Sequence, residues 1–299
     1  MKKTLLFLLF SIFTTAQSLD ATFGYNGVLA EYDNATTSSQ AVYDEVVQND
    51  IIYRVGYVKR NNSIKGIIVG YNTSGIFMHK EVGFVALQTA CFQADDKVVT
   101  AGQNKIYRIL PDNNFDTSFN TSGNQTINFG TYPMNIKCIS TQPDGKILVS
   151  GYVSNGTNND FAIAQLNADG SFDTTFDSDG MQTISFGTNN EHAFSHKIQS
   201  DGKIVVVGES FITNYDFAIV RLNTSGSLDT TFNGTGIKTI DFSSSIDKGR
   251  SFEILPDGKI VIFGQVAGTF GCMKLDTDGI SLDTSFGSSG KKIFTDLLS

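Results

Sequence analysis

The sequence has no tryptophan, only four prolines, and no stretch in which helix-forming residues recur at a period of 3.6. Turn formers and β formers dominate, and Gly, Asn, Thr, Ser and Phe are abundant, so we expect an all-β chain. Without a helix there is no place for a phosphate-binding loop that leads from a strand into a helix. That class of nucleotide site is therefore excluded.

Clustered positive charge is also missing. The formal net charge is −8, and it becomes two units more negative once Lys2 and Lys3 are removed with the N-terminal segment. Binding to nucleic acid or to anionic lipid needs clustered lysine and arginine. We therefore expect no nucleic-acid partner.

Cysteine is scarce and odd in number: Cys91, Cys138 and Cys272. An odd count in an exported chain does not make a complete disulfide framework. Cys91 and Cys138 both fall in apolar segments shortly before a polar turn, so we expect small buried thiols there. A Cys91–Cys138 disulfide between neighbouring repeats is the alternative.

The only long hydrophobic run lies at the N-terminus. Two lysines precede an apolar run over residues 5–13, and small residues end the segment at Ala16. This layout is typical of a secretory signal peptide over residues 1–16, with Gln17 as the new terminus. We expect residues 17–299 to form one domain that is secreted or held at the cell surface, without membrane insertion.

Two short motifs recur along the chain. The first is five residues long: a hydrophobic residue, then Asp, then a small residue, then Ser or Thr, and finally Phe. A Gly follows four residues after the Phe. This motif occurs at 19–23, 115–119, 172–176, 228–232 and 282–286. The second is an Asp-Gly-Lys turn before an apolar run, at 144–146, 201–203 and 257–259, with weaker copies at 95–97 and 48–50. The separation of the turns, between 55 and 60 residues, is typical of a repeat protein.

Each motif has a local physical reason. The Gly of an Asp-Gly turn adopts φ > 0 without a Cβ clash, which favours a tight hairpin. The apolar run that follows, as at 204–208, is typical of a strand buried on both faces. In the other motif the Asp can accept the backbone N–H two residues on, and we expect the Phe to fill a seam between repeats. These seam residues are Phe119, Phe176, Phe232 and Phe286.

About 55 residues therefore make four strands joined by short turns, which is one antiparallel blade. A blade cannot bury both faces alone, and radial stacking solves this in a β-propeller. We count five cores of three strands and six fourth strands, including those at 27–32 and 291–295. Five blades are predicted, with the N-terminal strand completing, or competing to complete, the last one. Part of a larger or incomplete propeller is the alternative.

The two motifs together resemble the delta-60 repeat, a β-propeller repeat of unknown function in exported bacterial proteins. The resemblance covers nearly all of residues 18–297 and is most specific in the three C-terminal copies. Residues 33–90 depart from it, because Met78 stands where the motif has Asp. The resemblance implies a fold and a compartment but no activity.

The loops between second and third strands differ most between copies. Those at 152–160 and 210–216 concentrate aromatic and amide side chains, which suit sugars or peptides because rings stack and amides form hydrogen bonds. We therefore expect ligand contacts from Tyr152, Asn155, Asn158, Asn159, Phe211, Asn214 and Tyr215. The expected partner is an extracellular glycan or protein.

Signals for metal binding are weaker. Glu191, His192 and His196 could hold a metal if they share one face of a strand, but a polar strand edge in one blade is the favoured explanation. The segments 177–180 and 276–279 resemble pieces of calcium loops, but the distant bidentate Glu of such loops is absent. Turn chemistry explains these aspartates, and weak Ca²⁺ binding is the alternative. No other cofactor is expected.

No catalytic set stands out, because the candidate acids are either repeated in most blades or isolated. The sequence therefore favours a non-enzymatic secreted or cell-surface binding scaffold. The alternatives are a funnel-site enzyme that acts on glycans, as a lyase or hydrolase, and a structural segment of a larger adhesin.

Overall fold

The computed structural model describes residues 39–49, 51–60, 63–71, 77–83 and 85–294. These residues form five antiparallel sheets and contain no helix, so the all-β prediction is confirmed. No helix in this part of the chain could cross a membrane. The predicted signal peptide and the predicted strand at 27–32 lie outside the described residues.

The sheets follow one another in chain order, each with the plan of the predicted blade. The first contains β1 (Ser39–Gln48), β2 (Ile51–Arg60), β3 (Ser63–Tyr71) and β4 (Phe77–Val82). The second contains β5 (Thr89–Phe92), β6 (Val98–Gly102), β7 (Lys105–Ile109) and β8 (Asn124–Thr126). The third contains β10 (Tyr132–Thr141), β11 (Ile147–Ser154), β12 (Asn159–Leu166) and β13 (Met181–Ile184), with the short β9 (Asn128–Phe129) beside β10.

The last two sheets repeat the plan of the third. The fourth contains β14 (Glu191–Ile198), β15 (Ile204–Phe211), β16 (Tyr215–Leu222) and β17 (Ile237–Ile240). The fifth contains β18 (Asp247–Ile254), β19 (Ile260–Val266), β20 (Thr269–Leu275) and β21 (Lys291–Phe294). Because β21 pairs with β20, a strand of the C-terminal segment takes the fourth position in this sheet.

The hairpin turns are as predicted. Gly145, Gly202 and Gly258 have φ of 84°, 84° and 81°, and each lies between the first and second strands of its sheet. In the weaker copies Asp96 and Asn49 take the left-handed conformation instead, with φ of 63° and 49°. Two of the second strands that follow are almost entirely buried on both faces: all five residues of β6 are buried, and in β15 all but Phe211 are.

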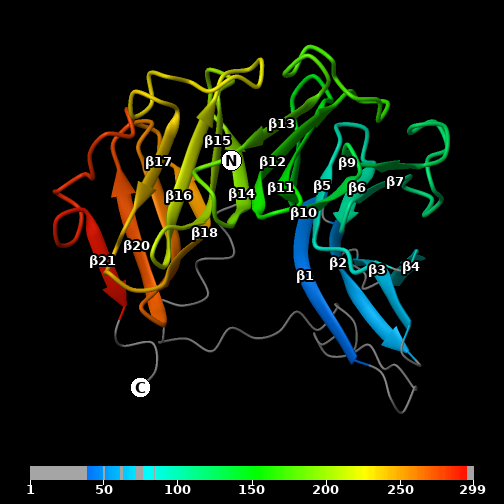
Figure 1. The fold of residues 1–299 in the computed structure, drawn as a ribbon. Coiled ribbons are helices and arrows are strands. Elements are labelled where there is room, and N and C mark those ends of the chain that lie inside the picture. The colour runs from blue at the N-terminus through cyan, green and yellow to red at the C-terminus, as the bar shows by residue number, and fades with distance from the viewer. Residues whose placement is uncertain (1–38, 50, 61–62, 72–76, 84, 295–299) are drawn as a thin grey trace.

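The sheets are arranged around an arc, with the first and the fifth at its two ends (Figure 1). The first strand of each sheet contacts the first strand of the next, so these strands are the innermost. Four hydrophobic clusters each join two consecutive sheets, so the core lies in the seams between sheets. A sheet alone could not bury these faces, and stacking is what stabilises it.

Three of the four predicted seam residues are fully buried: Phe119, Phe176 and Phe232. Each ring lies against a glycine in the turn after the third strand of the next sheet, and a Cβ on that glycine would come within 2.3–3.1 Å of the ring. The glycines are Gly170, Gly226 and Gly279. The residue after each Phe donates its N–H to a carbonyl of the same turn, at 2.7–2.8 Å. The Phe ring therefore fills the space between two blades, and the residue after it links them by a backbone hydrogen bond.

The prediction for Phe286 is wrong, because this residue is only half-buried. Phe286 belongs to the fifth sheet, where the described arc ends, so no described turn covers its ring (Figure 1). Burial of the seam Phe depends on the following sheet rather than on the motif itself.

The first seam uses a different contact, as the departure of residues 33–90 suggested. Lys80 of β4 places its Nζ 4.5 Å from the centre of the Phe115 ring and donates a hydrogen bond to the carbonyl oxygen of Asn113. Asn113 has φ of 69° and stands where the later turns have glycine. A lysine thus makes the contact with the next turn that a Phe makes elsewhere.

A buried aspartate joins the two repeat motifs. In the third sheet Asp173 Oδ1 accepts hydrogen bonds from the N–H and hydroxyl of Thr175, which confirms the predicted turn. Its Oδ2 lies 2.9 Å from Nζ of Lys146 in the Asp-Gly-Lys turn and accepts a hydrogen bond from Gln165. Burial opposes ionisation, but these contacts outweigh it and hold the pKa of Asp173 well below its usual range.

The same arrangement recurs in three other sheets. Asp116, Asp229 and Asp283 meet the lysines of their own turns, Lys97, Lys203 and Lys259, at 3.3, 2.9 and 2.9 Å. A cation on the third strand binds each aspartate as well: Arg108, Arg221 and Lys274. The pKa of Asp116 falls to about 2, since the hydrogen bonds and charges outweigh its burial.

The structure has no disulfide between Cys91 and Cys138, and both thiols are half-buried. Cys91 packs against the hydrophobic cluster that joins the second and third sheets. Cys272 of β20 is buried, as predicted.

The difference between Phe176 and Phe286 gives a direct test of the seam. Phe176→Ala should lower the free energy of unfolding by about 3–5 kcal/mol, because a fully buried ring is lost and a cavity remains. Phe286→Ala and Phe211→Ala should each cost far less, since both rings are partly exposed. Urea unfolding at neutral pH measures all three. Equal losses for Phe176→Ala and Phe286→Ala would contradict the role of the following sheet.

Candidate functional site

The innermost strands carry β-bulges that set the direction of their side chains. In four sheets the pairing of the first and second strands shifts by one residue, leaving an extra residue at Tyr43, Lys137, Phe194 and Arg250. A glycine of the second strand faces each bulge: Gly56, Gly151, Gly208 and Gly264. A Cβ on any of them would lie 1.9–2.0 Å from a carbonyl oxygen of the first strand. In each of these four sheets the bulge thus directs one variable side chain from the innermost strand.

Side chains from the third, fourth and fifth sheets meet around His192. The rings of Tyr152 and His192 have centroids 4.4 Å apart, and Tyr215 stacks on His192 at 6.1 Å. We call the following eight residues the central cluster: Lys137, Tyr152, His192, Phe194, Glu209, Tyr215, Lys248 and Arg250.

Cations cover the aromatic rings of this cluster. Nζ of Lys248 lies 4.5 Å from the centre of the Tyr215 ring, and the Arg250 guanidinium lies 4.0 Å from that of Phe194. Lys137 lies 5.6 Å from the centre of the Tyr152 ring. These distances suit cation–π contacts, which stabilise the cations above the rings.

Glu209 is the buried carboxylate of the central cluster. Its Oε1 is 3.0 Å from Nδ1 of His192, and its Oε2 is 3.8 Å from Lys248 and 3.5 Å from Arg250. The cluster therefore contains three cations and one carboxylate, in a chain whose net charge is −8. An excess of positive charge inside an acidic protein favours an anionic ligand at this place.

The electrostatics of the cluster fit this description. Burial, and then the charge of Arg250, lower the pKa of Lys137. Burial, followed by the nearby Glu209 carboxylate, raises the pKa of both Tyr152 and Tyr215, so both phenols stay protonated. Lys137 and Arg250 belong to the third and fifth sheets, so the effect of the Arg250 charge on Lys137 indicates that the innermost strands converge.

Both ring nitrogens of His192 have partners. Nδ1 lies against Glu209 and Nε2 is 3.1 Å from the side-chain nitrogen of Asn159, so Nδ1–H donates to Glu209 and Nε2 accepts. His196 lies elsewhere, with its two nitrogens 2.7 Å from the hydroxyls of Ser140 and Ser150. The two histidines therefore do not form one metal site with Glu191.

The predicted site residues fall into two groups. Tyr152 and Tyr215 come together through His192, as expected for adjacent sheets, and the Phe211 ring contacts Tyr215 at 5.2 Å. These three residues and Asn159 lie in strands rather than in loops, because the hairpins pair as far as Ser154–Asn159 and Phe211–Tyr215. Phe211 is 37% exposed.

The side-chain amides of the predicted site residues mainly form hydrogen bonds within their own loop. Asn155 donates to the side chains of Asn158 and Asp160 at 2.7 and 2.9 Å, and Asn158 also donates to the carbonyl oxygen of Asn189. Asn159 is committed to His192. Asn214 has a buried side-chain oxygen without a hydrogen-bond partner among the described residues.

The two segments that resemble calcium loops use their aspartates in turns. Asp179 accepts the N–H of Met181 and Asp278 accepts that of Ile280, both at 2.9 Å. Asp276 pairs with Lys259 at 3.0 Å.

Four charged residues of the central cluster were not predicted from the sequence: Lys137, Glu209, Lys248 and Arg250. The available signal was the glycine that ends each apolar second strand, because a glycine within a strand often marks a bulge. The repeat then places the variable side chain of each innermost strand opposite that glycine.

A pocket of about 580 Å³ lies beside this site at the end of the arc. Arg250 lines both the pocket and the central cluster, and Phe263, Phe270 and Phe294 supply apolar walls. By strand alternation, Phe263 and Phe270 lie on the face of the fifth sheet opposite to the one that packs on the fourth.

Glu191 and Asp160 form a buried acidic pair where the third sheet meets the fourth. Glu191 is fully buried, and neither carboxylate oxygen has a hydrogen-bond partner in the described part of the chain. Burial, and then the adjacent Asp160, raise the pKa of Glu191 to about 8. A protonated Glu191 can donate to Asp160, which removes the conflict between the two acids.

The stacked four-stranded sheets define a β-propeller protein. Within it, residues 142–176 and 199–232 match the model of a β-propeller domain of unknown function, DUF5122. Each matched segment begins at an Asp-Gly-Lys turn and ends at a seam Phe. The match is consistent with the delta-60 resemblance.

Solved structures with a similar fold share little sequence. A catalytically inactive virginiamycin B lyase from Staphylococcus aureus, solved with quinupristin, is 11% identical, with 90% of this chain and 88% of that chain covered and a TM-score of 0.50. A mutant puromycin hydrolase is 12% identical, with 82% and 39% covered and a TM-score of 0.51. The β-propeller domain of the trilobed protease from Pyrococcus furiosus is 12% identical, with 85% and 78% covered and a TM-score of 0.45. No curated protein matches the sequence.

The raised pKa of Glu191 predicts a pH-dependent stability. The folded state keeps this proton up to about pH 8, whereas the unfolded chain loses it near pH 4.5. The contribution of Glu191 to the free energy of unfolding is therefore fully present below pH 4.5, and it is lost as the pH rises to 8. Between pH 5.5 and 8.5 the wild type should lose about 1–3 kcal/mol more than Glu191→Gln in urea unfolding. The exposed Glu253→Gln should follow the wild type; identical profiles for all three proteins would refute the assignment.

Proposed function

We propose that this protein is a non-enzymatic binding scaffold, secreted or held at the cell surface, and that the central cluster is its ligand site. The observation that carries the proposal is that the central cluster holds three cations, Lys137, Lys248 and Arg250, and a single carboxylate, Glu209. That carboxylate lies 3.8 Å from Lys248 and 3.5 Å from Arg250. Arg250 is also exposed on the wall of the neighbouring pocket, so its guanidinium is accessible.

The same arrangement supports an acidic ligand. The faces of Tyr152 and Tyr215 are covered by His192 and by lysine, so these rings support the cations more than they offer stacking surfaces. Carboxylates are the natural partners of an arginine guanidinium and of lysine. An extracellular glycan that carries uronic acids supplies such groups on a chain that can reach the pocket beside Arg250.

A glycan and peptide array with neutral and acidic members tests this proposal. The wild type should bind uronate-containing glycans, and the signal should weaken with salt because the charges are partly exposed. Lys248→Ala together with Arg250→Ala should reduce affinity at least about tenfold, which is about 1.4 kcal/mol. Lys292→Ala, at an exposed position of β21, should bind as the wild type does.

Folding of each variant is checked by its thermal unfolding midpoint. Binding of neutral glycans only, or binding that survives the double substitution, would contradict the proposal. Hits confined to acidic peptides would keep the site but replace the glycan with a protein partner.

An enzyme that acts on glycans is the second candidate, and the contact between His192 and Glu209 is the observation that favours it. Acid–base catalysis needs a group that can exchange a proton with the substrate. Asn159 occupies the remaining nitrogen of His192, which argues against this role. Turnover of an array hit that is abolished by Glu209→Gln, with binding retained, would favour the enzyme.

A further inference from the structure

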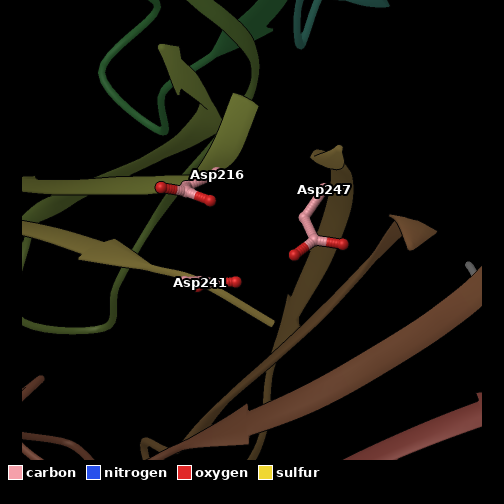
Figure 2. Close-up of side chains that lie close together, drawn as sticks. All are labelled: Asp216, Asp241 and Asp247. Carbon is pink, nitrogen blue, oxygen red and sulfur yellow. The ribbon is translucent and has the colours of Figure 1, made fainter. Parts of the chain in front are cut away.

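Three aspartates meet where the fourth sheet joins the fifth. Asp216 begins the buried part of β16, Asp241 follows β17, and Asp247 begins β18. One carboxylate oxygen from each lies within 4.8 Å of the others. Figure 2 shows one oxygen of each carboxylate directed into the space between the three side chains.

Hydrogen bonds fix two of these carboxylates. Asp247 Oδ2 accepts the N–H of Phe242 and of Ser243, at 2.8 and 2.9 Å. Asp241 Oδ1 accepts the N–H of Ser243 and of Ser244, at 3.1 and 2.6 Å. Both acids are thus held in place by the loop at 241–247 that joins the two sheets.

Asp216 has no such support. Its residue is only 6% exposed, and its Oδ1 is buried without a hydrogen-bond partner among the described residues. Among the described residues no ion pair involves any of the three acids. Lys291, a nearby lysine, donates instead to the carbonyl oxygens of Asp241 and Phe242. An unpaired buried carboxylate oxygen costs several kcal/mol unless a cation or a proton compensates it.

The seam between the third and fourth sheets also contains buried acids, and there a proton compensates their charge. There Asp160 and Glu191 occupy the positions of Asp216 and Asp247 at the starts of their strands. The pKa of Glu191 is raised to about 8, so that pair keeps a proton at neutral pH. Burial, and then Asp241 and Asp247, raise the pKa of Asp216 only to about 6, well below that of Glu191.

We propose that Asp216, Asp241 and Asp247 bind one Ca²⁺ that ties the loop at 241–247 to the seam between the fourth and fifth sheets. Calcium takes oxygen ligands at 2.3–2.6 Å, so oxygens on one ion lie at most about 5 Å apart, as these do. Magnesium needs 2.0–2.1 Å in near-ideal octahedral geometry, whereas calcium accepts a more variable arrangement, which suits ligands that come from three separate segments. Two of the ligands are pre-ordered by the loop, and the third is the unpartnered Asp216.

Calorimetric titration of chelator-treated protein with CaCl2 tests the site. We expect one ion per chain, a rise in the thermal unfolding midpoint with CaCl2, and a weaker response to MgCl2. Asp216→Asn should lower the calcium affinity at least tenfold. In the presence of chelator the same variant should be at least as stable as the wild type, because one of three repelling charges is gone.

Asp241→Asn, at an exposed position, is the second variant and should also lose calcium affinity while folding normally. Asp179→Asn, in a segment that resembles a calcium loop, should bind as the wild type does. The proposal is overturned if no heat or midpoint shift is seen up to about 10 mM CaCl2, beyond the range usual for extracellular modules. It is also overturned if Asp179→Asn, rather than Asp216→Asn, removes binding.

Discussion

The repeat depends on a buried aspartate that meets a lysine from a distant turn. Asp173 and Lys146 are far apart in the sequence, yet their contact joins the start of one repeat to its end. The same contact recurs with Asp229 and Lys203, and both pairs lie within the segments that match the family model. The aspartate also fixes the local turn, so the Phe three residues later reaches the seam. One side chain thus sets the geometry of a blade and its link to the next.

The blades differ at positions that take no part in the contacts of the repeated aspartate and the seam Phe. The bulge opposite each second-strand glycine presents one side chain from each innermost strand, and in consecutive sheets these are Lys137, Phe194 and Arg250. The backbone geometry is shared, but the chemistry is not. A surface with several cations can therefore form inside an acidic protein without disturbing the seams.

Much of the fold could be predicted from the sequence because its signals are local. Hairpin glycines such as Gly202, buried second strands and three seam rings each depend on a few adjacent residues. Phe286 could not be placed, since its burial requires a following sheet. The central cluster depends on bulge register, which only strand pairing reveals, and three acids from separate segments meet at Asp216. The loops between second and third strands are shorter than predicted, because the strands of these hairpins pair almost to their tips.

The most direct test of this account compares two aspartates of the same repeat type in urea unfolding. Asn at position 229 keeps the acceptor for the local turn but removes the charge that faces Arg221 and Lys203. Asp229→Asn should lower the free energy of unfolding by about 3 kcal/mol or more, because the buried Arg221 and the half-buried Lys203 lose their partner. Asp257→Asn, at an exposed turn, should stay within about 0.5 kcal/mol of the wild type. Equal, small effects at both positions would contradict the central role of the buried aspartate.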